Sequence, residues 1–175
     1  MLVAVLAGSA AGCASAQPEA APATSAPALP AATPASTAPA PLTVPDTLKF
    51  TAITVDGKPF DAATLAGKPT VFWFWAAWCS NCKGDAAGVR DLQAAVAANV
   101  NVVGVAGLKS GSDGMRKFVA DYRLTSFPQL ADDKGEVWKR FEVPSQHYYV
   151  VLDASGRVVH RGPLSVDQLR KTIGA

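Results

Sequence analysis

Few side chains in this sequence are suited to binding metals, and the chain carries little excess charge. Among 175 residues there are three cysteines, Cys13, Cys79 and Cys82, and two histidines, His147 and His160. Structural zinc normally takes four ligands, so this small supply argues against a conventional zinc site. The net charge of +2 is too weak to indicate nucleic acid as a partner. The glycine motifs typical of dinucleotide-binding proteins and kinases are also missing.

The N-terminal region is apolar but lacks basic residues. The first 48 residues contain no lysine or arginine, and no apolar run reaches the roughly 20 residues that span a bilayer. Residues 1–13 are small and apolar and end in SAAGC, which resembles a bacterial lipobox with Cys13 as the lipidated residue. Two features depart from this pattern, because Ala10 replaces a larger aliphatic residue and the basic start of a signal peptide is absent. The alternative is an ordinary secretory signal cleaved near Ala14 or Ala16.

Residues 14–46 form a tract of alanine, proline, serine and threonine that holds eight of the 13 prolines. Large apolar side chains are almost missing there, so burial cannot offset the entropy lost when the backbone is ordered. We predict a disordered linker that holds a folded domain, residues 47–175, away from a membrane or wall. Together with the N-terminal segment, it predicts an extracytoplasmic protein that is either lipid-anchored or secreted.

The most informative stretch is TVFWFWAAWCSNC, residues 70–82. An apolar run of strand length ends in a small-residue turn and is followed by a segment of helical character. Cys79 is therefore expected at a helix N-terminus, where unpaired N–H groups and the helix dipole favour a thiolate. Cys82 lies one turn further along, close enough to form a disulfide with Cys79. The alternatives are a metal site and a purely structural disulfide, and so short a loop would gain little from the latter.

This stretch resembles the active-site strand and turn of the thioredoxin superfamily, in its secreted TlpA/DsbE-like branch. The run GKPTVFWFWAAWC, with Asp85 three residues after the second cysteine, is especially similar to actinobacterial DsbE-like proteins. The similarity continues through FPQLADDKGEVWKRFEV and YYVVLDASGRVV and covers roughly residues 48–175. It implies a thioredoxin fold and a thiol–disulfide oxidoreductase whose redox-active disulfide needs no further cofactor. By the same resemblance, Cys79 is the nucleophile and Cys82 the resolving thiol.

The remaining pattern predicts an α/β domain with a central mixed sheet, helices on both faces and an N-terminal β-hairpin extension. The hairpin is expected at the Asp-Gly turn of residues 56–57. A helix from residue 79 or 80 to about Ala98, followed by a buried strand at residues 101–106, implies a right-handed crossover parallel to the central strand. Ser112 and Ser165 are expected to cap later helices.

Three residues near the cysteine pair depart from or extend the family pattern. Trp73 stands where thioredoxin carries a buried acid, so the usual proton acceptor for Cys82 is absent. Asp85 resembles the acid that TlpA/DsbE relatives carry one turn after the second cysteine; it is either an influence on proton transfer or an exposed helix residue. Trp78 is either a contact surface for substrate or a partly exposed packing residue.

The largest departure is His147, which stands where the family has a proline in the cis form facing the disulfide. Because a cis bond before a residue other than proline costs roughly 3 kcal/mol, we expect the peptide bond before His147 to be trans. Three roles are open for His147. Its imidazolium would favour the Cys79 thiolate, its ring would join Cys79 and Cys82 as ligands of copper, zinc or an iron–sulfur cluster, or it is a surface bystander.

The sequence thus predicts an extracytoplasmic enzyme that forms, reduces or exchanges disulfides in exported proteins. Its second partner would be an unidentified membrane electron donor or acceptor. One alternative is a reductant dedicated to cytochrome c maturation. Another is a metal-binding protein that uses Cys79, Cys82 and His147, although copper-delivery relatives of this fold usually space their cysteines CxxxC. Resemblance to actinobacterial DsbE-like proteins favours the oxidising direction.

Overall fold

The computed structural model describes residues 43–175, and its elements follow the predicted alternation of strands and helices. In chain order they are η1 (Asp46–Leu48), β1 (Thr51–Ile53), β2 (Pro59–Asp61), η2 (Ala62–Leu65), β3 (Thr70–Trp75), α1 (Ser80–Val96), β4 (Asn101–Ala106), α2 (Gly111–Asp121), β5 (Gln129–Ala131), α3 (Glu136–Arg140), β6 (Tyr148–Leu152), β7 (Val158–Gly162) and α4 (Val166–Ile173). Cys13 and residues 14–42 of the predicted linker lie outside the described residues. Within residues 43–175, no helix is both long and apolar enough to span a membrane.

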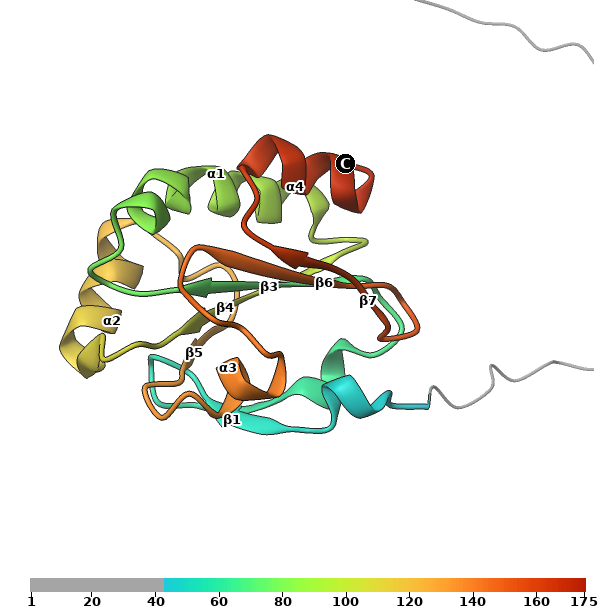
Figure 1. Cartoon of the computed structure of the whole chain (residues 1–175), viewed down its shortest axis with the longest axis horizontal. Coiled ribbons are helices and arrows are strands. Elements are labelled where there is room, and N and C mark those ends of the chain that lie inside the picture. The colour runs from blue at the N-terminus through green and yellow to red at the C-terminus, as the bar shows by residue number, and fades with distance from the viewer. Residues whose placement is uncertain (1–42) are drawn as a thin grey trace, which may run out of the picture. The chain divides into compact units, whose positions relative to one another are not determined.

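The central sheet is built around β3, the strand that leads to the cysteine pair (Figure 1). In the described part of the chain its strand order is β5-β4-β3-β6-β7. β4 runs parallel to β3 and β5 parallel to β4, whereas β6 is antiparallel to β3. Every residue of β3 is fully buried, because its nearly continuous run of large apolar side chains requires cover on both faces. The predicted strands at residues 70–75 and 101–106 are confirmed with these bounds.

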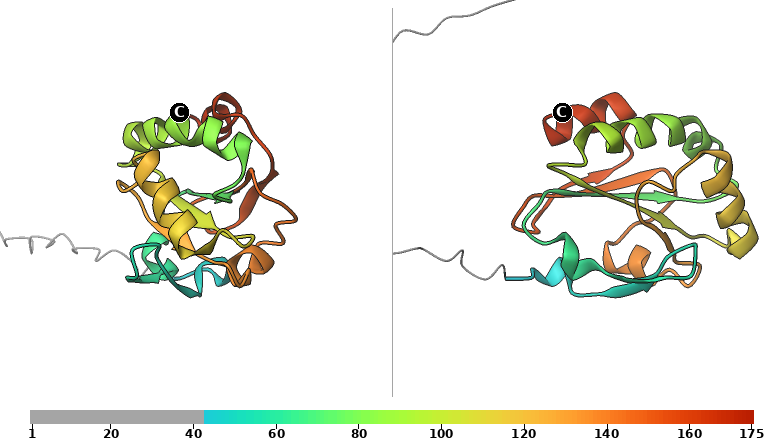
Figure 2. Two further views of the ribbon diagram at one scale, coloured as in Figure 1. Left: turned by 90° about the vertical axis from the view of Figure 1, so that its left-hand side faces the viewer. Right: turned by 180° about the vertical axis from the view of Figure 1, so that it is seen from behind.

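Different elements cover the two faces of the sheet (Figure 2). On one face, α1, α2 and α4 pack over a cluster that includes Trp73, Trp75 and Phe118. On the other face, η1, η2, α3 and the hairpin of β1 and β2 pack over Phe72 and Phe74. The alternation of side chains along β3 explains this division, because successive residues of a strand point to opposite faces. The predicted mixed sheet with helices on both faces and an N-terminal hairpin is confirmed.

Helix α1 begins immediately after Cys79, which occupies the N-cap position. Its apolar face buries Val89, Leu92 and Val96 against the sheet. The helix ends at Val96, two residues before the predicted end at about Ala98. Residues 97–99 form a turn. The consequence for the site is that Cys79 lies where the first N–H groups of a 17-residue helix converge.

The starts of the two later helices differ in how well the sequence predicted them. Ser165 caps α4 through a capping box with Gln168, as predicted. Helix α2 begins at Gly111, so Ser112 lies inside the helix and the prediction that it caps α2 was wrong. The carboxylate of Asp133 accepts hydrogen bonds from the N–H groups of Ser110 and Gly111 instead. A residue more than twenty positions away thus supplies the cap.

Candidate active site

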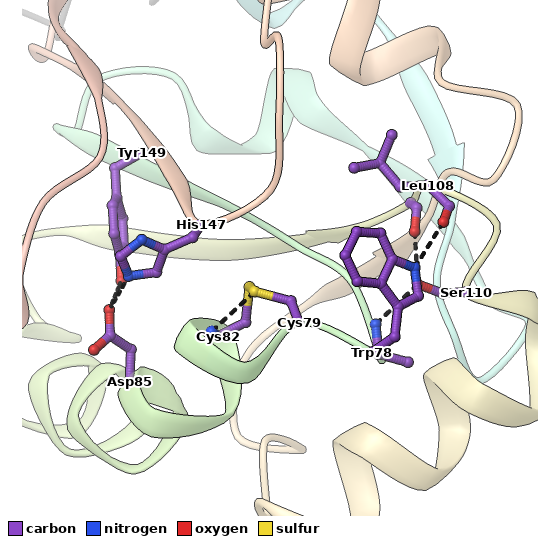
Figure 3. Close-up of a disulfide and its surroundings, with 10 residues drawn as sticks. Trp78, Cys79, Cys82, Asp85, Leu108, Ser110, His147 and Tyr149 are labelled. Carbon is purple, nitrogen blue, oxygen red and sulfur yellow. Dashed lines mark hydrogen bonds and ion pairs between the residues drawn. A yellow bond between two sulfur atoms is a disulfide. The ribbon is translucent and has the colours of Figure 1, made fainter.

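Cys79 and Cys82 form a disulfide at the junction of β3 and α1 (Figure 3). Their Cα atoms are 5.3 Å apart. The backbone N–H of Cys82 donates a hydrogen bond to Cys79 Sγ at 3.0 Å, so the sulfur itself acts as the helix cap. Cys79 is 4% exposed and Cys82 is 0% exposed. Of the two cysteines, only Cys79 therefore presents any surface to a reacting thiol.

Trp78 flanks the disulfide on one side and packs against a loop that we call the Leu108 loop, residues 107–111 (Figure 3). The Trp78 indole is 53% exposed, and its Nε1 donates a hydrogen bond to the Leu108 carbonyl at 2.9 Å. The N–H of Ala77 donates to Ser110 Oγ at 2.9 Å, and Ser110 Oγ donates to the Gly107 carbonyl at 2.6 Å. These bonds tie the turn before Cys79 to the Leu108 loop.

A second polar cluster, Asp85, His147 and Tyr149, lies on the other side of the disulfide (Figure 3). His147 Nε2 is 2.8 Å from Asp85 Oδ2, and the Tyr149 hydroxyl donates to the same oxygen at 3.2 Å. The side chains of Asp85 and His147 are each 23% exposed, so their hydrogen bond is largely shielded from water. Burial, reinforced by the neighbouring Asp85 carboxylate, raises the pKa of Tyr149 far above its usual range, so its hydroxyl stays protonated and donates.

The backbone at His147 has the geometry of neither a cis-proline loop nor a regular strand. The peptide bond before His147 is trans, as predicted, and residues 43–175 contain no cis bond. His147 has a φ of 58°, in the left-handed region that residues other than glycine rarely adopt. It directly precedes β6, so its position is fixed by the strand that carries Tyr149 two residues later. The histidine is thereby directed at Asp85 on α1.

Trp73 occupies the position where thioredoxin has a buried acid, and it is fully buried. Its ring lies 6.2 Å from the rings of Trp75 and Phe118, and its Nε1 has no hydrogen-bond partner. Its partner in the β3–β6 register is Tyr149. The side chain opposite Trp73 on β6 thus carries a hydroxyl, and this hydroxyl donates to Asp85 on α1.

The structure brings together Trp78, Cys79 and Cys82, and it pairs Asp85 with His147. Among residues 43–175 there is no group of three His, Cys, Asp or Glu side chains arranged to hold a metal ion. The alternative that Cys79, Cys82 and His147 form a metal site therefore gains no support. His160 lies on β7, apart from this pair, in register with Val151 of β6.

Three residues of this site were not predicted from the sequence: Tyr149, Leu108 and Ser110. Tyr149 carries a usable signal, because it lies near the start of the predicted strand that directly follows His147. Leu108 lies between Gly107 and Gly111, and a large apolar residue in a glycine-flanked loop is a weaker signal. No local pattern distinguishes Ser110 from other loop serines.

The fold and this site define a class of protein. It has a thioredoxin fold and a disulfide at a strand–helix junction, which is the arrangement found in thiol–disulfide oxidoreductases. The sequence profile of the AhpC/TSA family matches residues 43–161, more than half of the chain. The chain therefore belongs to the AhpC/TSA family. The predicted resemblance to thioredoxin-like proteins of the DsbE type is confirmed by the relatives described next.

The similar proteins are thiol–disulfide oxidoreductases and a secreted antigen. The soluble secreted antigen MPT53 of Mycobacterium tuberculosis is 41% identical over 111 residues, and the match covers 63% of this chain and 62% of MPT53. MTB dsbF, solved in mixed oxidized and reduced forms, is 43% identical with a TM-score of 0.70, covering 75% of this chain and 98% of that one. A secreted Mycobacterium tuberculosis disulfide oxidoreductase homologous to E. coli DsbE is 36% identical with a TM-score of 0.66, covering 73% and 96%.

Proposed function

We propose that this chain is an extracytoplasmic thiol–disulfide oxidoreductase that introduces disulfides into exported proteins. The observation that carries the proposal is the Cys79–Cys82 disulfide at the N-terminus of α1, with the Cys82 N–H directed at Cys79 Sγ. The secreted relatives support the location. Lipid anchoring through Cys13 is part of the proposal and is tested by whether Cys13→Ala releases the protein from membranes.

The reaction exchanges one disulfide for another without any added cofactor. A substrate thiolate attacks Cys79 Sγ, the Cys79–Cys82 bond breaks, and Cys82 leaves as a thiolate that takes up a proton. A second substrate thiolate then attacks the substrate sulfur of the mixed disulfide and releases Cys79 as a thiolate. Two substrate thiols are oxidised and the cysteine pair is reduced. A membrane electron acceptor must then reoxidise the pair, and the proposal names that acceptor only by this role.

The oxidising direction is favoured by groups that stabilise the reduced form. In the reduced pair the Cys79 thiolate would still accept the hydrogen bond from the Cys82 N–H. It would also lie at the positive end of the α1 dipole. A protein whose reduced form is stabilised in this way is a stronger oxidant, by about 30 mV for each tenfold change in the equilibrium constant. Trp73 in place of a buried acid removes a negative charge that would oppose the thiolate.

The first test is the reduction potential of the Cys79–Cys82 pair, measured by equilibrium titration of the metal-stripped protein in buffers of known potential. We expect a reversible two-electron transition above about −200 mV, in the range of oxidising proteins. A value near about −270 mV would contradict the oxidising direction and favour a reductant such as the cytochrome c maturation alternative. Cys79→Ser is the control, because it cannot form the disulfide and should show no transition.

Asp85, His147 and Tyr149 are proposed to support this chemistry without contacting the substrate. Because β3 carries no acid at Trp73, the proton that Cys82 takes up on reduction needs another route. Asp85 lies one turn after Cys82 on α1 and holds both His147 and Tyr149 through Oδ2. We assign this cluster as the proton route for Cys82, with the His147 imidazolium also favouring the Cys79 thiolate.

His147→Ala is expected to slow the alkylation of reduced Cys79 by about threefold near pH 6, with a smaller effect at high pH. The reason is that loss of a positive charge lowers the thiolate fraction only where Cys79 is partly protonated. The measurement is the rate of iodoacetamide modification at Cys79 across pH, followed by mass spectrometry. His160→Ala, at the chain's other histidine on β7, is the matched control. Equal pH profiles for wild type and His147→Ala would remove this role for His147.

A further inference from the structure

Two exposed apolar side chains beside the disulfide are not explained by the fold. Among residues 43–175, the large apolar side chains that stay exposed are Ile53, Trp78, Leu108 and Val159. Trp78 and Leu108 are in direct contact through the indole-to-carbonyl hydrogen bond, and both lie on the same flank of the disulfide (Figure 3). Neither belongs to the two apolar clusters of the core. Packing of the domain interior therefore does not account for their apolar character.

The backbone of the Leu108 loop is held in an unfavourable conformation. Leu108 and Lys109 have φ values of 54° and 57°, in the left-handed region. This region costs roughly 1–2 kcal/mol for a residue with a Cβ, and glycine or asparagine adopts it more readily. A leucine at such a position persists only where the surroundings fix the backbone, and conformations of this kind cluster at binding sites.

The surroundings of the Leu108 loop do fix it. The Leu108 carbonyl accepts from Trp78, Ser110 Oγ bridges the N–H of Ala77 and the Gly107 carbonyl, and Asp133 accepts from the N–H groups at the start of α2. The loop is thus tied to the turn before Cys79 and to the loop after β5. Leu108 is 38% exposed within this rigid frame, so its apolar surface is available without reorganisation.

We propose that Trp78 and Leu108 form an apolar ledge that receives a large apolar side chain next to the reacting cysteine of the substrate. The occupant is a segment of an exported protein, since the ledge lies on one flank of the disulfide and Cys79, which directly follows Trp78, is the cysteine of the pair that retains some exposure. Rigid aromatic and aliphatic surface of this kind carries much of the binding energy at protein interfaces. The inference rests on the proposed thiol–disulfide exchange and adds a specificity-determining residue, Leu108, to it.

The test compares two otherwise identical dithiol peptides, one with phenylalanine and one with aspartate beside the reacting cysteine. Oxidation of each by the full-length disulfide form is followed by mass spectrometry, and the ratio of the two rates is the readout. The ratio is informative because any change in the chemistry of the Cys79–Cys82 pair alters both rates alike. We expect the wild type to oxidise the phenylalanine peptide about tenfold faster, and Leu108→Asn to reduce this preference to below about threefold.

Asparagine is chosen at residue 108 because it tolerates the left-handed conformation while removing the apolar surface. Ile53→Asn is the matched control, since Ile53 is an apolar residue on β1 that is 53% exposed and takes no part in the hydrogen bonds around the disulfide. It should retain the wild-type ratio. An unchanged ratio in Leu108→Asn, or equal rates for both peptides in the wild type, overturns the ledge. A Leu108-dependent dimer in sedimentation overturns it too, because the ledge would then be an interface between two copies.

Failure of the proposed function is distinguishable from failure of the ledge. If the disulfide oxidises neither peptide under conditions in which the peptides react with a small-molecule disulfide, the oxidising function itself is wrong. If both peptides are oxidised without preference, the function stands and only the ledge fails.

Discussion

Replacing Cys82 with serine is expected to turn the protein into a trap for its substrates. In this variant the Cys79 thiolate attacks the disulfide of an already oxidised substrate, which is the reverse of the second exchange step proposed above, and the resulting mixed disulfide lacks the neighbouring thiol that would break it. Turnover with dithiol substrates should fall by at least about a thousandfold, because a single cysteine cannot carry two electrons through the cycle. The mixed disulfides should be visible on non-reducing gels and should disappear when a reductant is added.

The matched variant Cys79→Ser should lose turnover equally but trap nothing. The difference follows from burial, because Cys82 lies within the first turn of α1 and is 0% exposed, whereas Cys79 occupies the N-cap position and is 4% exposed. A substrate disulfide can reach the Cys79 sulfur but not that of Cys82. Mass spectrometry of the adducts locates the attached cysteine. Adducts of equal yield on Cys82 in the Cys79→Ser protein would contradict the assignment of Cys79 as nucleophile.

The sequence predicted best those elements whose residues meet the core at every position. The bounds of β3 and β4 were predicted correctly because nearly every residue of these strands is apolar, and burial on both faces leaves such strands little freedom. The end of α1 was predicted two residues late, because the alanines after Val96 are compatible with both helix and turn. The start of α2 was missed because its first N–H groups are satisfied by Asp133 from a distant loop.

The site was predictable only where it is local in sequence. The cysteine pair follows from a strand, a turn and a helix that are contiguous along the chain. Asp85 and His147 were predicted separately, and their hydrogen bond joins residues 62 positions apart. Likewise, the bond between Trp78 and the Leu108 carbonyl joins residues 30 positions apart, and neither residue type requires the contact. Such contacts depend on the packing of α1, β6 and the Leu108 loop around the sheet, which periodicity alone does not specify.

Gly104→Ala is expected to destabilise the domain by about 3–5 kcal/mol, although it adds only one methyl group. Gly104 lies in β4 beside the buried side chain of Gln129. A Cβ at this position would lie 1.9 Å from Gln129 Oε1 and 2.9 Å from Trp75 Nε1. Those two atoms are themselves hydrogen-bonded at 3.1 Å. The alanine would therefore break a buried polar contact as well as crowd the core.

Gln129 cannot move aside cheaply, because its Nε2 also donates to the Leu124 carbonyl at 3.2 Å. Displacing the amide would leave buried donors and acceptors unpaired, each at about 1–3 kcal/mol, in addition to the strain of overpacking. Gly84→Ala is the matched control, since Gly84 is exposed within α1 and a Cβ there meets nothing within 4 Å. It should instead stabilise the protein by up to about 1 kcal/mol, because alanine is the better helix former.

Opposite signs for the same chemical change separate the effect of packing from that of backbone propensity. The measurement is denaturant unfolding of both variants and the wild type, all with the Cys79–Cys82 disulfide intact so that the redox state does not contribute. If the free energy of unfolding of Gly104→Ala lies within about 1 kcal/mol of the wild-type value, Gln129 must have a second low-energy arrangement in the core. The edge of the sheet formed by β4 and β5 would then be more adaptable than its hydrogen bonds indicate. The predicted large loss instead requires that Trp75, Gln129 and Gly104 act as one fixed unit beneath the turn that presents Cys79.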